Sequence, residues 1–235
     1  MTSYMKAERK KAKLRLAITG PSGSGKTYGA LMIAFGLGGK IAMIDTENGS
    51  GNLYADLGDY DIAPISAPFD PRRFINGIHM AEEQGYDIII IDGLSHEWNG
   101  LGGVLDIQLK ISETKYKGNS YAAWRDVTPI HNSLIETILA SPCHIIATMR
   151  SKTDYVISEN DKGRTEIHKV GLAPVQRDGI DYEFCTVFDL TPNHLASVSK
   201  DRTRLFDGKV IILSKETGET LRKWLNLENV IQEEL

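Results

Sequence analysis

The stretch AITGPSGSGKTYGA, residues 17–30, decides the fold of this chain. It carries the pattern G-x-x-x-x-G-K-T from Gly20 to Thr27, after an apolar run at 14–18 and before apolar residues at helical spacing over 26–38. Glycines let backbone N–H groups converge on phosphate oxygens, and the start of a helix adds the positive end of its dipole. The stretch therefore predicts a strand, a phosphate-binding loop and a helix that together bind a nucleoside triphosphate.

Within this loop, Lys26 is expected to reach the β- and γ-phosphates, and the Thr27 hydroxyl is expected to ligate Mg²⁺. ATP is the expected nucleotide, although the loop reads phosphate and the sequence has no identifiable element that reads a base. The predicted nucleotide-binding residues of the loop are Gly20, Pro21, Ser22, Gly23, Ser24, Gly25, Lys26, Thr27 and Tyr28.

The rest of the chain first alternates strands with helices. Strands are predicted at 40–44, 61–67, 86–92 and 143–149, and helices at 70–85, 104–116 and 123–140. Beyond Arg150 short strands dominate, at 153–172 (two, joined by a polar turn at 161–163), 182–190, 194–199 and 209–213, before a helix at 216–225. This order predicts an α/β fold: a P-loop NTPase core with a mostly parallel sheet flanked by helices, and a β-rich C-terminal part.

The 235 residues suit one domain, which we place at 14–226, between a basic N-terminal segment (1–13) and an acidic tail (227–235). The longest apolar runs fall short of the ~20 residues that span a bilayer, and the charged N-terminus does not resemble a secretory signal. We therefore expect a cytoplasmic protein without a membrane partner. The net charge of −4 means that any contact with nucleic acid needs a local basic patch.

Two further acidic segments are predicted to complete the site. YDIIIID (86–92) ends in Asp92, a carboxylate suited to holding Mg²⁺ directly or through water. The next residue is Gly93, so a glutamate that activates water must come from elsewhere. In IAMIDTENGSGN (41–52) the apolar run stops at two carboxylates, Asp45 and Glu47. We expect them at the same sheet edge, facing the metal site and the attacking water. Glu47 is the expected base; Glu97 is an alternative base, and a purely surface role for Glu47 also remains open.

The segments GPSGSGKT, IDTEN and IIIIDGLS, in this order between residues 14 and 149, resemble the core of RecA/RadA-type recombinases. The resemblance implies that Glu47 is the catalytic base and Asp92 the acid on the magnesium side. The chain departs from that family in IIATMRSK, where Arg150 follows Thr148 and Met149 in place of an Asn-Gln sensor. Arg150 is expected to sense phosphate through charge-assisted hydrogen bonds.

Lys200 and Arg202, in SVSKDRTRLFDGK, resemble a Lys-x-Arg pair that RecA-like helicases and the RadA branch place against the phosphate of a neighbouring subunit. The resemblance implies trans-acting residues that stabilise charge in the transition state, and therefore a homo-oligomer. The alternative is a solvated basic turn.

The whole chain, including KVGLAPVQRDGIDYEFCTVFDL, resembles the small phage-encoded RecA-core ATPases of the Sak type. This implies a DNA-stimulated ATPase in a bacterial host cell that acts on single-stranded DNA in phage recombination or annealing. A phage or host single-strand-binding protein would be its partner.

Three segments are candidate DNA contacts: 5–15, the aromatic and basic run 113–125, and 150–177. For each of them a solvated or core-packing role is the alternative. Two other functions remain open for the chain. One is a P-loop small-molecule kinase in which Asp45 holds an acceptor hydroxyl, and the other is an ATP-dependent assembly switch without DNA chemistry.

Overall fold

The computed structural model describes residues 12–159 and 165–226, and the side chains of 153–172 are not part of that description. Most of the basic N-terminal segment, the whole acidic tail and the polar turn at 161–163 therefore lie outside the described residues.

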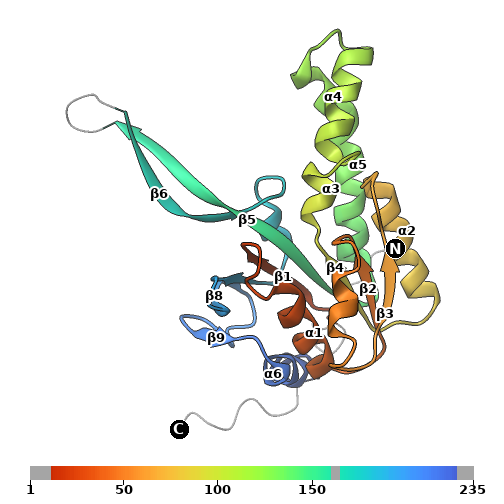
Figure 1. Cartoon of the computed structure of the whole chain (residues 1–235), viewed down its shortest axis with the longest axis vertical. Helices are drawn as coiled ribbons and strands as arrows, with labels where there is room; N and C mark the ends of the chain where they lie inside the picture. The colour runs from red at the N-terminus through yellow and green to blue at the C-terminus, as the bar shows by residue number, and fades with distance from the viewer. Residues whose placement is uncertain (1–11, 160–164, 227–235) are drawn as a thin grey trace, which may run out of the picture.

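One mixed sheet of nine strands forms the centre of the described part of the chain (Figure 1). Its order is β3-β2-β4-β5-β1-β7-β8-β9, and β6 pairs with β5. The strands from β3 to β7 along this order run parallel, whereas β6, β8 and β9 are antiparallel to their neighbours. The predicted α/β class with a β-rich C-terminal part is confirmed. The strands are β1 (Arg15–Gly20), β2 (Ile41–Asp45), β3 (Asp61–Pro64), β4 (Ile88–Asp92), β5 (His144–Glu159), β6 (Thr165–Pro174), β7 (Thr186–Leu190), β8 (Leu195–Asp201) and β9 (Val210–Ile212).

Helices cover both faces of the sheet, because buried strands alternate their side chains between two apolar cores. In β4, Ile88 and Ile90 pack toward α1 (Lys26–Leu37) and α6 (Lys215–Asn226), whereas Ile89 and Ile91 pack toward α2 (Pro71–Glu83) and α5 (Ser120–Ala140). Helices α1 and α6 approach closely at Gly36 and Gly218, where an added methyl group would overlap the backbone of the facing helix. This contact fixes the C-terminal helix beside the helix that follows the phosphate-binding loop.

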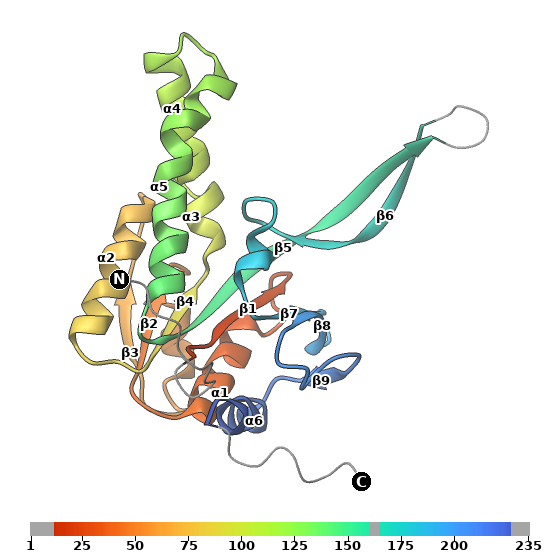
Figure 2. The same cartoon turned by 180° about the vertical axis from the view of Figure 1, so that it is seen from behind.

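Two projections leave the body of the sheet, as both views show (Figures 1 and 2). One is a helical pair formed by α4 (Val104–Lys115) and α5, both at the predicted positions. The other is an antiparallel ribbon of β5 and β6. The sequence predicted separate strands at 143–149 and after 153, whereas β5 is one strand from the core to Glu159. No helix was predicted between 93 and 103, yet α3 (Ser95–Asn99) forms there.

The register of the parallel strands brings the candidate residues to one edge. Asp45 of β2 pairs with Asp92 of β4, Asp92 with Thr148 of β5, and Gly20 of β1 with Arg150 of β5. In open α/β sheets this carboxyl edge is where ligands bind. Within the described residues, the helices are all too short or too polar to cross a bilayer.

Candidate functional site

The loop of residues 20–25 joins β1 to α1 and forms one wall of a pocket of about 420 Å³. Gly23 and Gly25 have φ values of 76° and 88°, a left-handed conformation that a glycine adopts without steric cost. Lys26 is half-buried there, and its Nζ donates hydrogen bonds of 3.0 and 2.8 Å to the carbonyl oxygens of Gly20 and Pro21. The pocket is lined by Ser22, Gly23, Gly25, Lys26, Thr27, Glu47, Ser50, Tyr54, Asp92 and Arg150.

Four of the loop residues predicted to bind nucleotide do not line this pocket. Gly20 and Pro21 contribute carbonyl oxygens to Lys26, and Ser24 is buried beneath the loop. Tyr28 also lies outside the pocket; it packs edge-on against Tyr54 at 6.2 Å between ring centroids.

A residue that the sequence analysis missed supports the loop from below. His194, in the turn between β7 and β8, donates from Nδ1 to the carbonyl oxygen of Ser24 over 3.0 Å. The same nitrogen would lie 3.1 Å from a Cβ placed on Gly25. The φ of 88° at Gly25 and this close contact both favour glycine at position 25, and His194 ties the β-rich part to the phosphate-binding loop. A polar turn in PNH was its only signal in the sequence.

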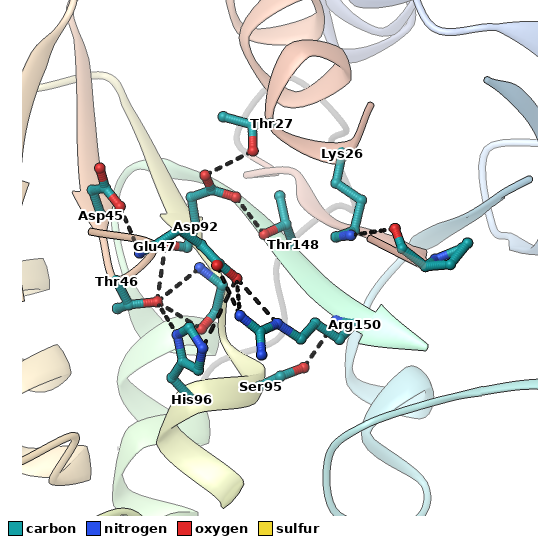
Figure 3. A network of polar contacts seen from close by, with 12 residues as sticks. Lys26, Thr27, Asp45, Thr46, Glu47, Asp92, Ser95, His96, Thr148 and Arg150 are labelled. Atoms are coloured by element: carbon teal, nitrogen blue, oxygen red, sulfur yellow. Dashed lines mark hydrogen bonds and ion pairs between the residues drawn. The ribbon is translucent and has the colours of Figure 1, made fainter. Parts of the chain in front are cut away.

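Asp92 lies at the end of β4 between two threonine hydroxyls (Figure 3). Thr27 Oγ1 donates to one carboxylate oxygen over 2.9 Å, and Thr148 Oγ1 donates to the other over 2.6 Å. Burial raises the pKa of Asp92, and the two hydroxyl hydrogen bonds oppose that rise.

Thr27 and Asp92 together fit a magnesium site. Mg²⁺ takes few protein ligands and completes its shell with water and phosphate oxygens. The described residues contain no cluster of three or more His, Cys, Asp or Glu side chains able to hold a metal. One hydroxyl and one carboxylate beside a phosphate-binding loop suit this ion.

Of the two carboxylates that end β2, only Glu47 faces the pocket. Asp45 is buried and accepts the backbone N–H groups of Glu47 and Gly51 over 2.6 and 3.2 Å. The expectation that Asp45 faces the metal site or the attacking water is therefore wrong. Its oxygens hold the turn that presents Glu47, which also removes the group that the kinase interpretation assigned to an acceptor hydroxyl.

Glu47 and Arg150 form an ion pair at the mouth of the pocket (Figure 3). Arg150 Nη2 donates to both carboxylate oxygens, over 3.0 and 2.8 Å, and its Nε donates to Oε1 over 3.2 Å. The backbone N–H of Arg150 donates to Ser95 Oγ over 2.9 Å, which anchors α3 to β5. The guanidinium is therefore held by Glu47 in the pocket that the phosphate-binding loop also lines.

His96 of α3 approaches Glu47 from the other side. Its Nε2 lies 4.0 Å from Glu47 Oε1, and its Nδ1 lies 2.8 Å from Thr46 Oγ1. Phe69 stacks on the imidazole at 4.9 Å between ring centroids. Burial lowers the pKa of His96, the nearby Glu47 carboxylate opposes that shift, and a neutral ring is favoured. From the sequence alone, His96 was a candidate for lining a nucleotide or DNA channel, with an ordinary hydrogen-bonded polar residue as the alternative.

Glu97, the alternative base, lies outside the pocket. It is fully buried, and its two oxygens contact His131 Nδ1 and Gln176 Nε2, each over 2.9 Å. Gln176 also donates to the Leu94 carbonyl oxygen over 3.3 Å. These bonds give Glu97 a structural position between α3, α5 and the segment after β6.

Lys200 and Arg202 also lie outside the pocket of their own chain. Lys200, on β8, donates from Nζ to the carbonyl oxygens of Asp181 and Tyr182 over 2.9 and 2.7 Å. Arg202, just past the end of β8, donates to the carbonyl oxygen of Tyr182 over 3.4 Å. Burial and the neighbouring Arg202 charge lower the pKa of Lys200.

The parallel sheet, the glycine-rich loop and the Lys26–Thr27–Asp92 arrangement define a P-loop nucleotide-binding domain. A family model described as an AAA domain matches residues 12–220. The match covers most of the chain, and the chain therefore belongs to this AAA domain family, as an AAA-type P-loop ATPase-like domain. A search of curated proteins gives no match to the chain.

Proposed function

We propose that this protein is a RecA-like ATPase that hydrolyses ATP with Mg²⁺ and acts on single-stranded DNA. The observation that carries the ATPase role is the convergence of Glu47 and Arg150 on the pocket that also holds Lys26, Thr27 and Asp92. A phosphate-binding loop alone would bind a nucleotide. A carboxylate held on the opposite wall adds a group that can take a proton from water.

Each residue has a distinct part in this proposal. Lys26 and the loop N–H groups bind phosphate oxygens, while Thr27 and Asp92 hold Mg²⁺, which when bound neutralises charge on the β- and γ-phosphates. Glu47 orients the attacking water and accepts its proton. Arg150 exchanges its donors between the Glu47 carboxylate and a γ-phosphate oxygen, so that the same side chain positions the base and reads the phosphate.

The DNA role is proposed from the resemblance to RecA/RadA-type recombinases and Sak-type phage ATPases. In this role DNA stimulates turnover, and the protein serves phage recombination or annealing beside a single-strand-binding protein. Lys200 and Arg202 act in trans within a homo-oligomer. Neither side chain lines the pocket of its own chain, which supports action on a neighbour's phosphate over action in cis.

Steady-state ATP hydrolysis with and without single-stranded DNA tests this function, with Glu47→Gln as the control. Hydrolysis that rises with DNA and disappears in the variant is the expected result. A rate of ATP hydrolysis that does not change with DNA would remove the DNA role and leave an ATPase or an assembly switch. Phosphoryl transfer to a small acceptor without release of inorganic phosphate would replace the ATPase with a kinase.

A further inference from the structure

A second and larger cavity, of about 1000 Å³, lies where α3 and the first turns of α5 meet the start of the β5–β6 ribbon. We call it the groove. It draws on segments that are distant in the sequence, including 113–125 and 150–177, which the sequence analysis named separately as candidate DNA contacts. The side chains that matter below are Trp98, Tyr121, Trp124, Arg125, Lys152 and Arg177.

One wall of the groove is aromatic. Trp98 of α3 stacks on Trp124 of α5, with ring centroids 5.7 Å apart and planes inclined by 20°. His131 meets the Trp98 ring edge-on at 5.4 Å and fixes its orientation from behind. Tyr121, one turn before Trp124, is 91% exposed. Half-buried indoles beside an exposed phenol provide flat surfaces that other planar groups can stack on.

The other side of the groove is basic. Arg125, Lys152 and Arg177 line it, and none of the three forms an ion pair with another side chain that the structure describes. Arg177 donates to the amide oxygen of Asn132 over 3.1 Å, which orients its guanidinium without neutralising it. Asp178 is the single acidic side chain in the lining that the structure describes. The groove is therefore locally positive on a chain whose net charge is −4.

We propose that the groove is the site that holds single-stranded DNA, with unpaired bases stacked on the Trp98–Trp124–Tyr121 wall and phosphates against Arg125, Lys152 and Arg177. This inference rests on the proposed DNA role and names the residues that perform it. Aromatic platforms interleaved with cations are the chemistry that binds a single strand, because every base has a stacking face while paired bases do not expose it. The volume is more than twice that of the nucleotide pocket and suits more than one nucleotide.

The groove shares two elements with the nucleotide pocket. His96 and Trp98 are two residues apart on α3, one beside Glu47 and the other in the groove wall. Arg150 and Lys152 are two residues apart on β5, one in the pocket and the other in the groove. A strand in the groove therefore contacts the helix whose His96 lies beside Glu47 and the strand that carries Arg150.

The test uses fluorescence anisotropy to measure the affinity of the full chain for two labelled oligonucleotides of equal length, oligo-dT and oligo-rU. Tyr121→Ala should weaken dT binding about tenfold to a hundredfold, through loss of one stacked base. Arg125→Ala combined with Lys152→Ala should lower the slope of log affinity against log salt by about 1.4, or ~0.7 for each lost phosphate contact. Tyr182→Ala and Lys110→Ala serve as matched controls, since both residues lie outside the groove. A thermal melt of each variant checks that it is folded.

The chain has three tryptophans, so Trp224→Phe leaves the two of the groove as its tryptophan fluorophores, which excitation at about 295 nm separates from the tyrosines. Oligo-dT should quench this variant with the same affinity that anisotropy reports. If the wild type binds oligo-dT and Tyr121→Ala and the double variant bind it equally well, the groove is not the DNA site, although the DNA role stands. A wild type that binds no oligo-dT, or binds oligo-rU alone, would overturn both.

Discussion

Glu47→Gln is the change that most directly separates binding of ATP from its hydrolysis. The amide keeps the shape of the side chain and cannot take a proton from water. Loss of a general base lowers kcat by about a hundredfold to ten-thousandfold. Because Glu47 faces the pocket while Lys26, Thr27 and Asp92 form its other wall, ATP affinity should survive the change.

The structure also gives the size of the effect on affinity. Arg150 uses Nε and Nη2 on Glu47, so a phosphate that takes these donors competes with the ion pair, and the strength of the pair opposes nucleotide binding. The two side chains are 47% and 28% exposed, and a pair this open to solvent contributes about 0–1 kcal/mol. Removing the carboxylate charge should therefore tighten ATP binding, by no more than about fivefold.

Two measurements decide the outcome: the affinity for a fluorescent ATP analogue, and single-turnover hydrolysis of ATP with Mg²⁺. Arg150→Ala is the matched variant, because it breaks the same ion pair from the other side and should weaken ATP binding. Turnover of Glu47→Gln at the wild-type rate would remove Glu47 as the base. Affinity reduced more than about tenfold would show that the carboxylate supports binding, against the geometry described here.

Four further predictions follow from single residues. Lys26→Ala should abolish tight ATP binding, measured by the same fluorescence titration. Asp92→Asn should stop Mg²⁺-dependent hydrolysis and raise the melting temperature. Burial raises the pKa of Asp92, so its charged form lowers the free energy of unfolding at neutral pH. An unchanged or lower melting temperature would contradict this. Burial lowers the pKa of His144 to about 4. As the pH falls below 6.5, His144 is protonated in the unfolded chain before it is protonated in the folded one. Up to about 3 kcal/mol of unfolding free energy should therefore be lost between pH 6.5 and 4. His144→Gln should flatten that dependence in urea titrations. Lys200→Ala or Arg202→Ala should lower turnover only in the assembled protein, and equal rates at all protein concentrations would make the turn structural.

The sequence predicted the part of the fold that depends on local pattern. The loop from Gly20 to Thr27 has a fixed spacing, and Asp92 ends a strand too apolar to lie anywhere but the sheet centre. Parallel strands then place Glu47 at the same edge without any knowledge of its contacts. These inferences needed only the periods of helices and strands and the direction of the sheet.

What the sequence could not provide were contacts between distant side chains. In the sequence, Asp45 and Glu47 are both carboxylates close to the end of one strand. Only the structure shows that the oxygens of Asp45 accept hydrogen bonds from the backbone N–H groups of Glu47 and Gly51. The sequence allowed Glu97 as an alternative base, whereas in the structure His131 and Gln176, from two other segments, bind both of its carboxylate oxygens. The helix α3 has five residues and is too short to display a hydrophobic period, which is why no helix was predicted there.

The position of α3 explains why a single short segment after β4 carries so many of the contacts. Ser95 binds the backbone of Arg150, His96 faces Glu47, Glu97 enters the buried network with His131, and Trp98 forms the groove wall. Successive residues of a helix point in different directions, so one turn reaches four environments. A displacement of α3 by a ligand in the groove would move His96, a close neighbour of Glu47, because His96 and Trp98 share the same short helix. Stimulation of hydrolysis by DNA should accordingly appear in kcat, where the position of the base acts, more than in the affinity for ATP.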